Sequence, residues 1–152
     1  MTHSHNENQV RRTLDLYAHY ADTRQAKKQT DLFAPDAVFN VFAAGNEETP
    51  AQTFKTPAEI LAVCENLKRY KTTFHFNGQS LIEIAPDEHF ATAETYTLAY
   101  HEIDVAGKNS LMNVAIRYND EFIKIADTWK FKQRNLYIRF VDTKYGIDSQ
   151  QI

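Results

Sequence analysis

Four consecutive segments decide the fold of this chain: TFHFNGQSLIEI (73–84), HFATAETYTLAYHEIDV (89–105), SLMNVAIRYNDEFIKI (110–125) and TWKFKQRNLYIRFV (128–141). Along them the side chains change character with a period of two, and Phe, Tyr, Thr, Val and Ile are abundant, as is typical of β-strands. The connections between the segments are short, and short links between long strands indicate an antiparallel meander. Strands of this length do not stay flat, so we expect a twisted sheet with at least one bulge.

Helical periodicity precedes these strands. Apolar residues at helical spacing predict a first helix over 7–21, a second is expected at about 23–34, and Thr56-Pro57 opens a third. A strand is expected at about 37–43, and the short segment QTFK predicts another. Helices first and strands last indicate the α+β class. We therefore expect three N-terminal helices packed on a curved, mostly antiparallel sheet, forming a cone with a cavity between the two layers.

The composition is that of one globular domain over residues 1–152. Hydrophobic residues make up 43% and aromatic residues 12%, which is enough for a core without disulfides. The formal net charge of −3 argues against nucleic acid as the main partner. Cys64 is the single cysteine, so an intramolecular disulfide is excluded. No apolar run approaches the ~20 residues of a membrane span, and the N-terminus has no apolar signal segment, so we expect a cytoplasmic protein.

The common motifs for metals, nucleotides and hydrolytic serines are missing from the sequence. The chain contains no HExxH or DxDxG motif, no GxGxxG or GxxxxGK motif, and no GxSxG motif. We therefore expect neither a metal nor another cofactor, and look for chemistry that side chains perform alone.

Asp22 is the first candidate for such chemistry. It follows Ala18 by four residues and Leu14 by eight, so it extends the apolar stripe of the first helix, and its carboxylate would face the core or a pocket. The alternative is structural, because Asp22 and Gln25 together fit a capping box at the start of the second helix.

Histidines and aromatic residues supply the other candidates. In TTFHFNGQ, His75 points to the face opposite Phe74 and Phe76, where it would either enter the cavity or remain an ordinary core or surface histidine. The same two readings apply to His101. Tyr118 lies on one strand face with apolar residues that line a pocket or simply pack. Arg134, in the last strand, is an edge residue that would normally be solvated.

Several stretches together resemble the SnoaL-like branch of the NTF2-like superfamily. They are LDLYAHYAD (14–22), LFAPDAVF (32–39), TTFHFNG (72–78) and RYNDEFIKIADTWKFKQRN (117–135), and the resemblance extends over about 7–142. It implies the cone-shaped fold. Three catalytic relatives that the chain resembles are lyases: hexachlorocyclohexane dehydrochlorinase, bile-acid 7α-dehydratase and scytalone dehydratase.

The resemblance also implies site residues, which match the family position by position. Asp22 and His75 match a catalytic Asp–His dyad, and Tyr17 matches the tyrosine of the bile-acid dehydratase. The expected substrate-binding residues are Arg134, His101 and Tyr118. At two places the sequence departs from these relatives, which narrows the range of expected reactions. Tyr17 stands where the dehydrochlorinase has a lysine, and Ile116 and Tyr118 replace the serine and asparagine of scytalone dehydratase.

The resemblance implies a cofactor-independent lyase or isomerase that uses Asp–His acid–base chemistry on a small, largely apolar, oxygenated substrate. Three alternatives remain open at this point: a non-catalytic ligand-binding module, a polyketide cyclase, and a small subunit of a ring-hydroxylating dioxygenase. Because the outer face of the sheet is rich in Tyr, Phe and Ile, we also expect a homo-oligomer, either a dimer or a trimer.

Overall fold

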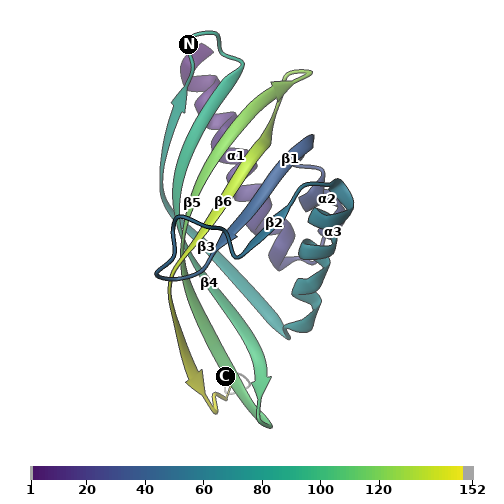
Figure 1. Ribbon diagram of the computed structural model, residues 1–152, viewed down its shortest axis with the longest axis vertical. Coiled ribbons are helices and arrows are strands. Elements are labelled where there is room, and N and C mark those ends of the chain that lie inside the picture. Colours follow the sequence, from purple (N-terminus) through teal and green to yellow (C-terminus); the bar gives the residue numbers. More distant parts are fainter. Residues whose placement is uncertain (1, 149–152) are drawn as a thin grey trace.

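One curved sheet of six strands dominates the computed structural model, which describes residues 2–148 (Figure 1). Residues 1 and 149–152 of the expected domain lie outside the described part. The strand order is β2-β1-β6-β5-β4-β3, and only the β1–β6 pair is parallel. The bounds are Phe33–Phe42 (β1), Gln52–Phe54 (β2), Thr72–Ile84 (β3), Phe90–Val105 (β4), Lys108–Ile125 (β5) and Thr128–Tyr145 (β6). The predicted α+β class and mostly antiparallel sheet are confirmed.

Bulges give the long strands their curvature. The β3–β4 register shifts between Asn77 and Ser80, and the β5–β6 register shifts twice, at Ala115/Ile116 and at Glu121/Phe122. Each bulge adds local twist, so the sheet bends around the helices instead of extending as a flat layer. The expectation of at least one bulge is therefore confirmed.

Helix α1 (Thr2–Asp22) starts five residues earlier than the expected helix over 7–21. Apolar periodicity did not reveal this earlier start, because the N-terminal residues are polar and one of them, Asn6, is nevertheless buried. Asn6 is 2% exposed, and its Oδ1 accepts hydrogen bonds from Trp129 Nε1 at 3.3 Å and from Lys124 Nζ at 3.1 Å. A buried polar contact thus anchors the N-terminal part of the helix to β5 and β6, which apolar periodicity does not reveal.

The second helix is much shorter than expected. α2 covers Ala26–Thr30 only, and β1 already begins at Phe33 rather than at residue 37. Pairing with β6 ends the helix, since Phe131 N–H donates to the Leu32 carbonyl at 2.9 Å. Pro35 has no backbone N–H to donate. It lies in the interval where the β1–β6 register shifts, so the sheet loses no regular ladder hydrogen bond there.

Helix α3 (Pro57–Glu65) begins as predicted at Thr56-Pro57. Thr56 Oγ1 accepts from Glu59 N–H at 3.2 Å while a Glu59 carboxylate oxygen accepts from Thr56 N–H at 3.1 Å, which forms a capping box. A 3₁₀ turn, Asn66–Arg69, then leads into β3. Helices α2 and α3 lie next to each other at the β1–β2 side of the sheet, while α1 runs across its concave face (Figure 1).

The core lies between α1 and the concave face of the sheet. Its largest fully buried apolar side chains come from β1, β5, β6, α1 and α3: Phe39, Phe122, Trp129, Phe131, Leu14 and Ile60. On the opposite face Phe74, Phe76 and Phe140 are each more than half exposed. The expected homo-oligomer stays a prediction, and these aromatic residues are where a second copy would pack.

Candidate functional site

Asp22 is the last residue of α1, which carries its carboxylate to β3. The alternative role as a cap is wrong, because Gln25 is the N-cap of α2 and no side chain caps that helix. Instead Asp22 Oδ2 accepts the His75 backbone N–H at 2.8 Å, and Asp22 Oδ1 accepts Thr73 Oγ1–H at 3.0 Å. The helix end and the strand are thereby joined through this one carboxylate.

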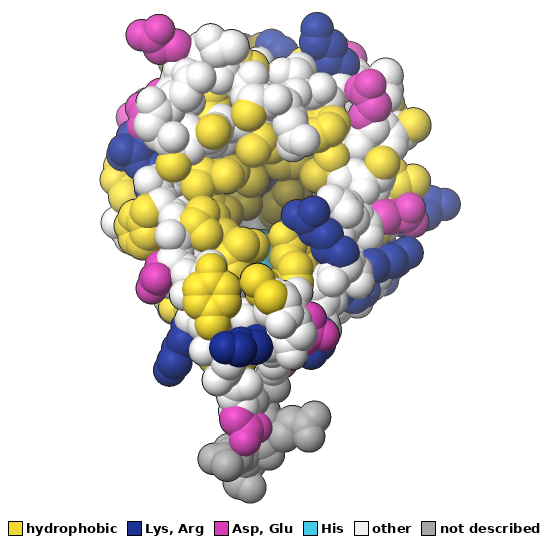
Figure 2. All heavy atoms as spheres, turned by 60° about the horizontal axis from the view of Figure 1, so that its bottom comes forward, with side chains coloured by type: hydrophobic (Ala, Val, Ile, Leu, Met, Phe, Trp, Pro, Cys, Tyr) yellow, Lys and Arg dark blue, Asp and Glu magenta, His cyan; other side chains and the backbone are white. Residues whose placement is uncertain are grey.

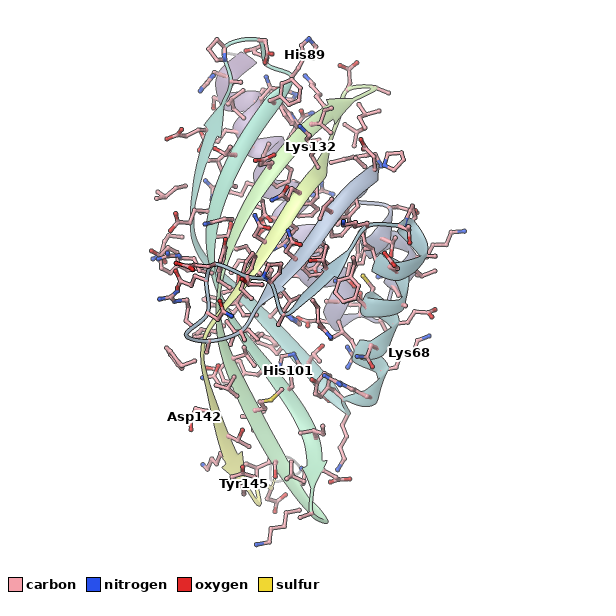
Figure 3. The ribbon with its side chains drawn as sticks, viewed as in Figure 1. Lys68, His89, His101, Lys132, Asp142 and Tyr145 are labelled. Carbon is pink, nitrogen blue, oxygen red and sulfur yellow. The ribbon has the colours of Figure 1, made fainter. Side chains whose placement is uncertain are left out.

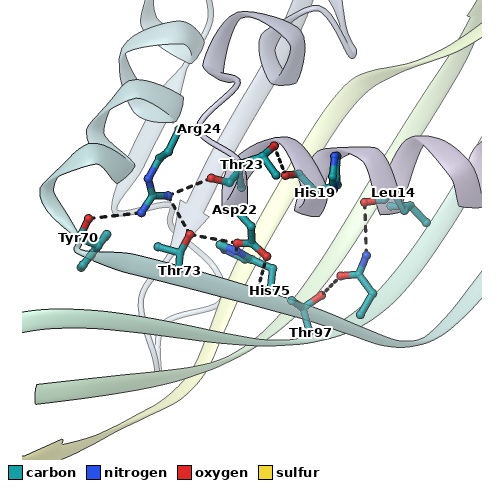
Figure 4. A network of polar contacts seen from close by, with 11 residues as sticks. Leu14, His19, Asp22, Thr23, Arg24, Tyr70, Thr73, His75 and Thr97 are labelled. Atoms are coloured by element: carbon teal, nitrogen blue, oxygen red, sulfur yellow. Dashed lines mark hydrogen bonds and ion pairs between the residues drawn. The ribbon is translucent and has the colours of Figure 1, made fainter. Parts of the chain in front are cut away.

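The imidazole of His75 completes the pair. Its Nδ1 lies 2.7 Å from Asp22 Oδ1, and the His75 side chain is 8% exposed (Figure 4). The ionised carboxylate is an acceptor only, so Nδ1 carries the proton in this contact and Nε2 remains the unprotonated nitrogen. The arrangement fixes both the tautomer and the plane of the ring.

Arg24 supports the pair from the turn that follows α1. Its Nη1 donates to Thr73 Oγ1 at 2.8 Å and to the Ala21 carbonyl at 3.0 Å, and its Nη2 donates to the Tyr70 carbonyl at 3.4 Å (Figure 4). Arg24 has a φ of +58°, a left-handed conformation uncommon for a residue with a side chain. These hydrogen bonds hold the strained turn and orient the Thr73 hydroxyl towards Asp22.

The carboxylate of Asp22 is ionised at neutral pH. Burial alone would raise the pKa of Asp22, but the hydrogen bonds from the His75 side chain and backbone, together with Thr73, outweigh burial and lower that pKa below its ordinary value. A fixed negative charge therefore lies behind the imidazole of His75.

A cavity of about 310 Å³ opens in front of His75. Figure 2 shows the hollow bounded by hydrophobic side chains, with histidine visible inside it. Four of the six predicted site residues line it: Tyr17, His75, His101 and Tyr118. Most of the remaining wall is aliphatic or aromatic, so a ligand here would be largely removed from water.

A second hollow, of about 340 Å³, lies at the other end of the sheet and includes Phe90 and Lys132 in its wall. Figure 3 shows Lys132 and His89 at that end, far from His101. Because the Asp22–His75 pair opens into the first hollow, we take that one as the candidate site and call it the dyad cavity.

His101 lies beside the pair on β4. Its ring centroid is 5.6 Å from that of His75 and 4.5 Å from that of Tyr70. Burial, aided by the nearby His75, lowers the pKa of His101 to about 4, so the ring is neutral at neutral pH. Its Nδ1 is buried and has no hydrogen-bond partner in the described residues.

Tyr17 and Tyr118 form the inner wall of the dyad cavity, with ring centroids 6.2 Å apart in an edge-to-face arrangement. Burial raises the pKa of both phenols, that of Tyr17 well above its ordinary value. Both hydroxyl groups therefore keep their protons at neutral pH and can act as hydrogen-bond donors.

Arg134 is not the solvated edge residue that its strand position suggested. β6 lies inside the sheet between β1 and β5, and Arg134 is 2% exposed. Its guanidinium carbon lies 3.6 Å from the ring centroid of Tyr118 and 4.0 Å from that of Tyr17. Arg134 is also not part of the cavity wall, whereas Tyr17 and Tyr118, against whose rings it packs, are. Direct substrate binding by Arg134 is therefore not what the structure favours.

Asp120 is the charged partner of Arg134. The two residues are opposite each other on β5 and β6, and Arg134 Nε lies 3.7 Å from Asp120 Oδ1. Burial raises the pKa of Asp120 to about 7, while the nearby Arg134 acts in the opposite direction. Asp120 was not among the residues predicted from the sequence, and its position opposite Arg134 follows from the β5–β6 register.

Three polar residues of the dyad cavity were not predicted: Gln29, Arg69 and Tyr70. Arg69 and Tyr70 come from the 3₁₀ turn and its end, and Arg69 Nη2 donates to Tyr70 Oη at 2.6 Å. Gln29 belongs to helix α2, whose five residues are too few to show a helical pattern of apolar residues. Only the packing of α2 against α3 and α1 brings Gln29 to the cavity.

Other kinds of site find little support within residues 2–148. No three His, Cys, Asp or Glu side chains in this range are grouped so that they could hold a metal ion. All helices in the same range are too short or too polar to cross a membrane.

Solved structures with the same fold include enzymes. A candidate scytalone dehydratase from Novosphingobium aromaticivorans superposes with a TM-score of 0.75 at 17% identity, over 95% of this chain and 93% of that one. A hexachlorocyclohexane dehydrochlorinase from Novosphingobium barchaimii gives 0.77 at 19% identity, over 95% and 94%. The beta subunit of a candidate aromatic-ring-hydroxylating dioxygenase from N. aromaticivorans gives 0.72 at 16% identity, over 90% of both chains.

At these identities the likeness shows the fold. No curated protein matches the sequence. The model of the SnoaL-like domain matches residues 2–135, which is most of the chain. The chain therefore belongs to the SnoaL-like domain family.

Proposed function

We propose that the protein is a cofactor-independent lyase or isomerase of the dehydratase type, acting on a small, largely apolar, oxygenated substrate. The observation that carries this proposal is the 2.7 Å contact between Asp22 Oδ1 and Nδ1 of His75, a residue that lines the dyad cavity. Such a pair makes a neutral histidine into a positioned base, and the surrounding apolar wall strengthens its electrostatic effect by excluding water.

His75 acts as the base in this proposal. Its Nε2 accepts a proton from a carbon next to a carbonyl group, and Asp22 stabilises the imidazolium ion that forms. The ionised state of Asp22, which follows from its lowered pKa, supports this role. Positioned general bases of this kind contribute about 10²–10⁴-fold to a rate.

Tyr17 and His101 stabilise the negative charge that develops on the substrate. The Tyr17 hydroxyl keeps its proton and donates a hydrogen bond to the carbonyl oxygen as it becomes an enolate. Neutral His101, with its unpartnered Nδ1, supplies a second polar contact. Arg134 acts through the rings of Tyr17 and Tyr118, as a positioning residue that places positive charge behind them.

In a dehydration the electron pair of the broken C–H bond forms the new C=C bond while the neighbouring C–O bond breaks. The proton held by His75 passes to the departing oxygen, so water leaves and His75 returns to its neutral form. In an isomerisation the same proton returns to another carbon of the substrate. Both reactions conserve atoms and charge without a redox partner.

An assay with a panel of small β-hydroxyketones tests this proposal. We expect the wild-type protein to convert at least one member to the unsaturated ketone with loss of water, detected by mass spectrometry, and His75→Gln to leave it unchanged. Binding of the panel without any conversion would overturn the lyase and favour the non-catalytic ligand-binding module. Equal conversion by wild type and His75→Gln would overturn the role of the dyad.

A further inference from the structure

Gln29 is a buried amide in the wall of the dyad cavity to which none of the proposed steps assigns a role. The residue is 1% exposed, and its Oε1 has no hydrogen-bond partner in the described part of the chain. Leaving a buried amide oxygen unpaired destabilises a fold, so such atoms are rare and call for an explanation. A ligand that pairs with the oxygen when bound provides one.

The neighbourhood of Gln29 does not supply that partner. The adjacent hydroxyl of Thr30 donates to the Ala26 carbonyl at 2.9 Å, and the backbone N–H of Gln29 donates to the Gln25 carbonyl at 2.9 Å. Cys64, on α3, lines the same cavity, and burial raises the pKa of its thiol to about 11, so it brings no charge to this wall. Gln29 is a lining residue of the dyad cavity, so a group bound there is the remaining candidate partner for its amide oxygen.

We propose that Gln29 is a specificity-determining residue that binds a hydroxyl group of the substrate, at the α2 wall of the dyad cavity. A hydroxyl both donates and accepts, so it pairs with the amide in either of its two orientations. This inference rests on the proposed function, because it assigns a substrate feature to the same cavity.

The substrate class follows from the positions of the polar groups. His75 and His101 come from β3 and β4, whereas Gln29 comes from a helix, and most of the other lining residues are apolar. A fitting molecule has a reactive carbonyl at the histidines, an apolar body, and a separate hydroxyl that reaches Gln29. Sites that hydrogen-bond a substrate hydroxyl reject analogues without it far more strongly than apolar pockets reject a missing methylene.

Binding of matched probes tests this inference without depending on turnover. The probes are indanone and its ring-hydroxylated isomers, with dissociation constants measured by calorimetry. We expect at least one hydroxyindanone to bind wild type roughly tenfold more tightly than indanone. Gln29→Leu is expected to lose this preference. Gln9→Leu is the matched control, because Gln9 Oε1 is also buried and unpartnered but lies outside the dyad cavity.

Stability provides a second readout of Gln29→Leu. Replacing an unpaired buried amide by an apolar side chain of similar size is expected to keep or raise the midpoint of thermal unfolding. The inference is overturned if wild type shows no preference for any hydroxyindanone, if Gln29→Leu keeps the preference, or if no probe binds. If the dyad is not catalytic, the binding preference for a hydroxyindanone is still expected. Failure of the lyase proposal therefore appears in the turnover assay and not in the binding measurement.

Discussion

Asp22→Asn is expected to lower the turnover number by about 10⁴-fold while the protein stays folded. The amide of asparagine can donate to His75 Nδ1, which reverses the tautomer and places the ring proton on Nε2. The base that faces the cavity is then lost although the size of the side chain hardly changes. The measurement is the turnover number on a β-hydroxyketone that wild type converts, with circular dichroism to verify folding.

Asp15→Asn is the matched control for this experiment. Asp15 lies on the same helix and is exposed, so the substitution changes the charge equally without touching the dyad. Its turnover number should equal that of wild type. Full activity of Asp22→Asn would show that the carboxylate does not orient a catalytic histidine, and the acid–base mechanism would be withdrawn.

Arg134→Met is expected to lower the free energy of unfolding by about 1–3 kcal/mol. Without its cation the buried Asp120 carboxyl takes up a proton at neutral pH, because Arg134 is the group that lowers its pKa, and neither of its oxygens has a hydrogen bond in the described residues that would offset the loss. The substitution also removes the guanidinium from the faces of Tyr17 and Tyr118. Urea unfolding followed by circular dichroism measures the change.

The double variant Asp120→Leu with Arg134→Met separates the charge from the packing. Replacing both members of a buried ion pair by apolar side chains is often neutral, so we expect the double variant to recover most of the lost stability. If Arg134→Met alone is as stable as wild type, or if the double variant is no better than the single one, the pair does not stabilise the core as described.

Much of the fold could be predicted because its signals are local. The long strands alternate over enough residues to be recognised individually, and Thr56-Pro57 marks the start of α3 by a cap that depends only on adjacent residues. The end of α2 could not be predicted in this way. It depends on pairing of the Leu32–Phe33 backbone with β6, about a hundred residues further along the chain.

The candidate site, too, was predictable only in part from the sequence. Asp22 and His75 were identified together only through the family resemblance, since the local pattern around Asp22 favoured a helix cap equally well. The burial of Arg134 could not be foreseen, because it requires that β1 pair beside β6 and turn an expected edge strand into an inner one. Gln29 carries no sequence signal at all, and its role rests on the tertiary packing of α2.

The proposed function depends on His75, held by Asp22, removing a proton from carbon inside the dyad cavity. The most direct test is deuterium exchange at the carbon next to the carbonyl of indanone, followed by proton NMR in heavy water with wild type and His75→Gln. We expect wild type to accelerate the exchange and His75→Gln to return it to the rate in buffer. Equal acceleration by both proteins, or none by either while indanone remains bound, would contradict it.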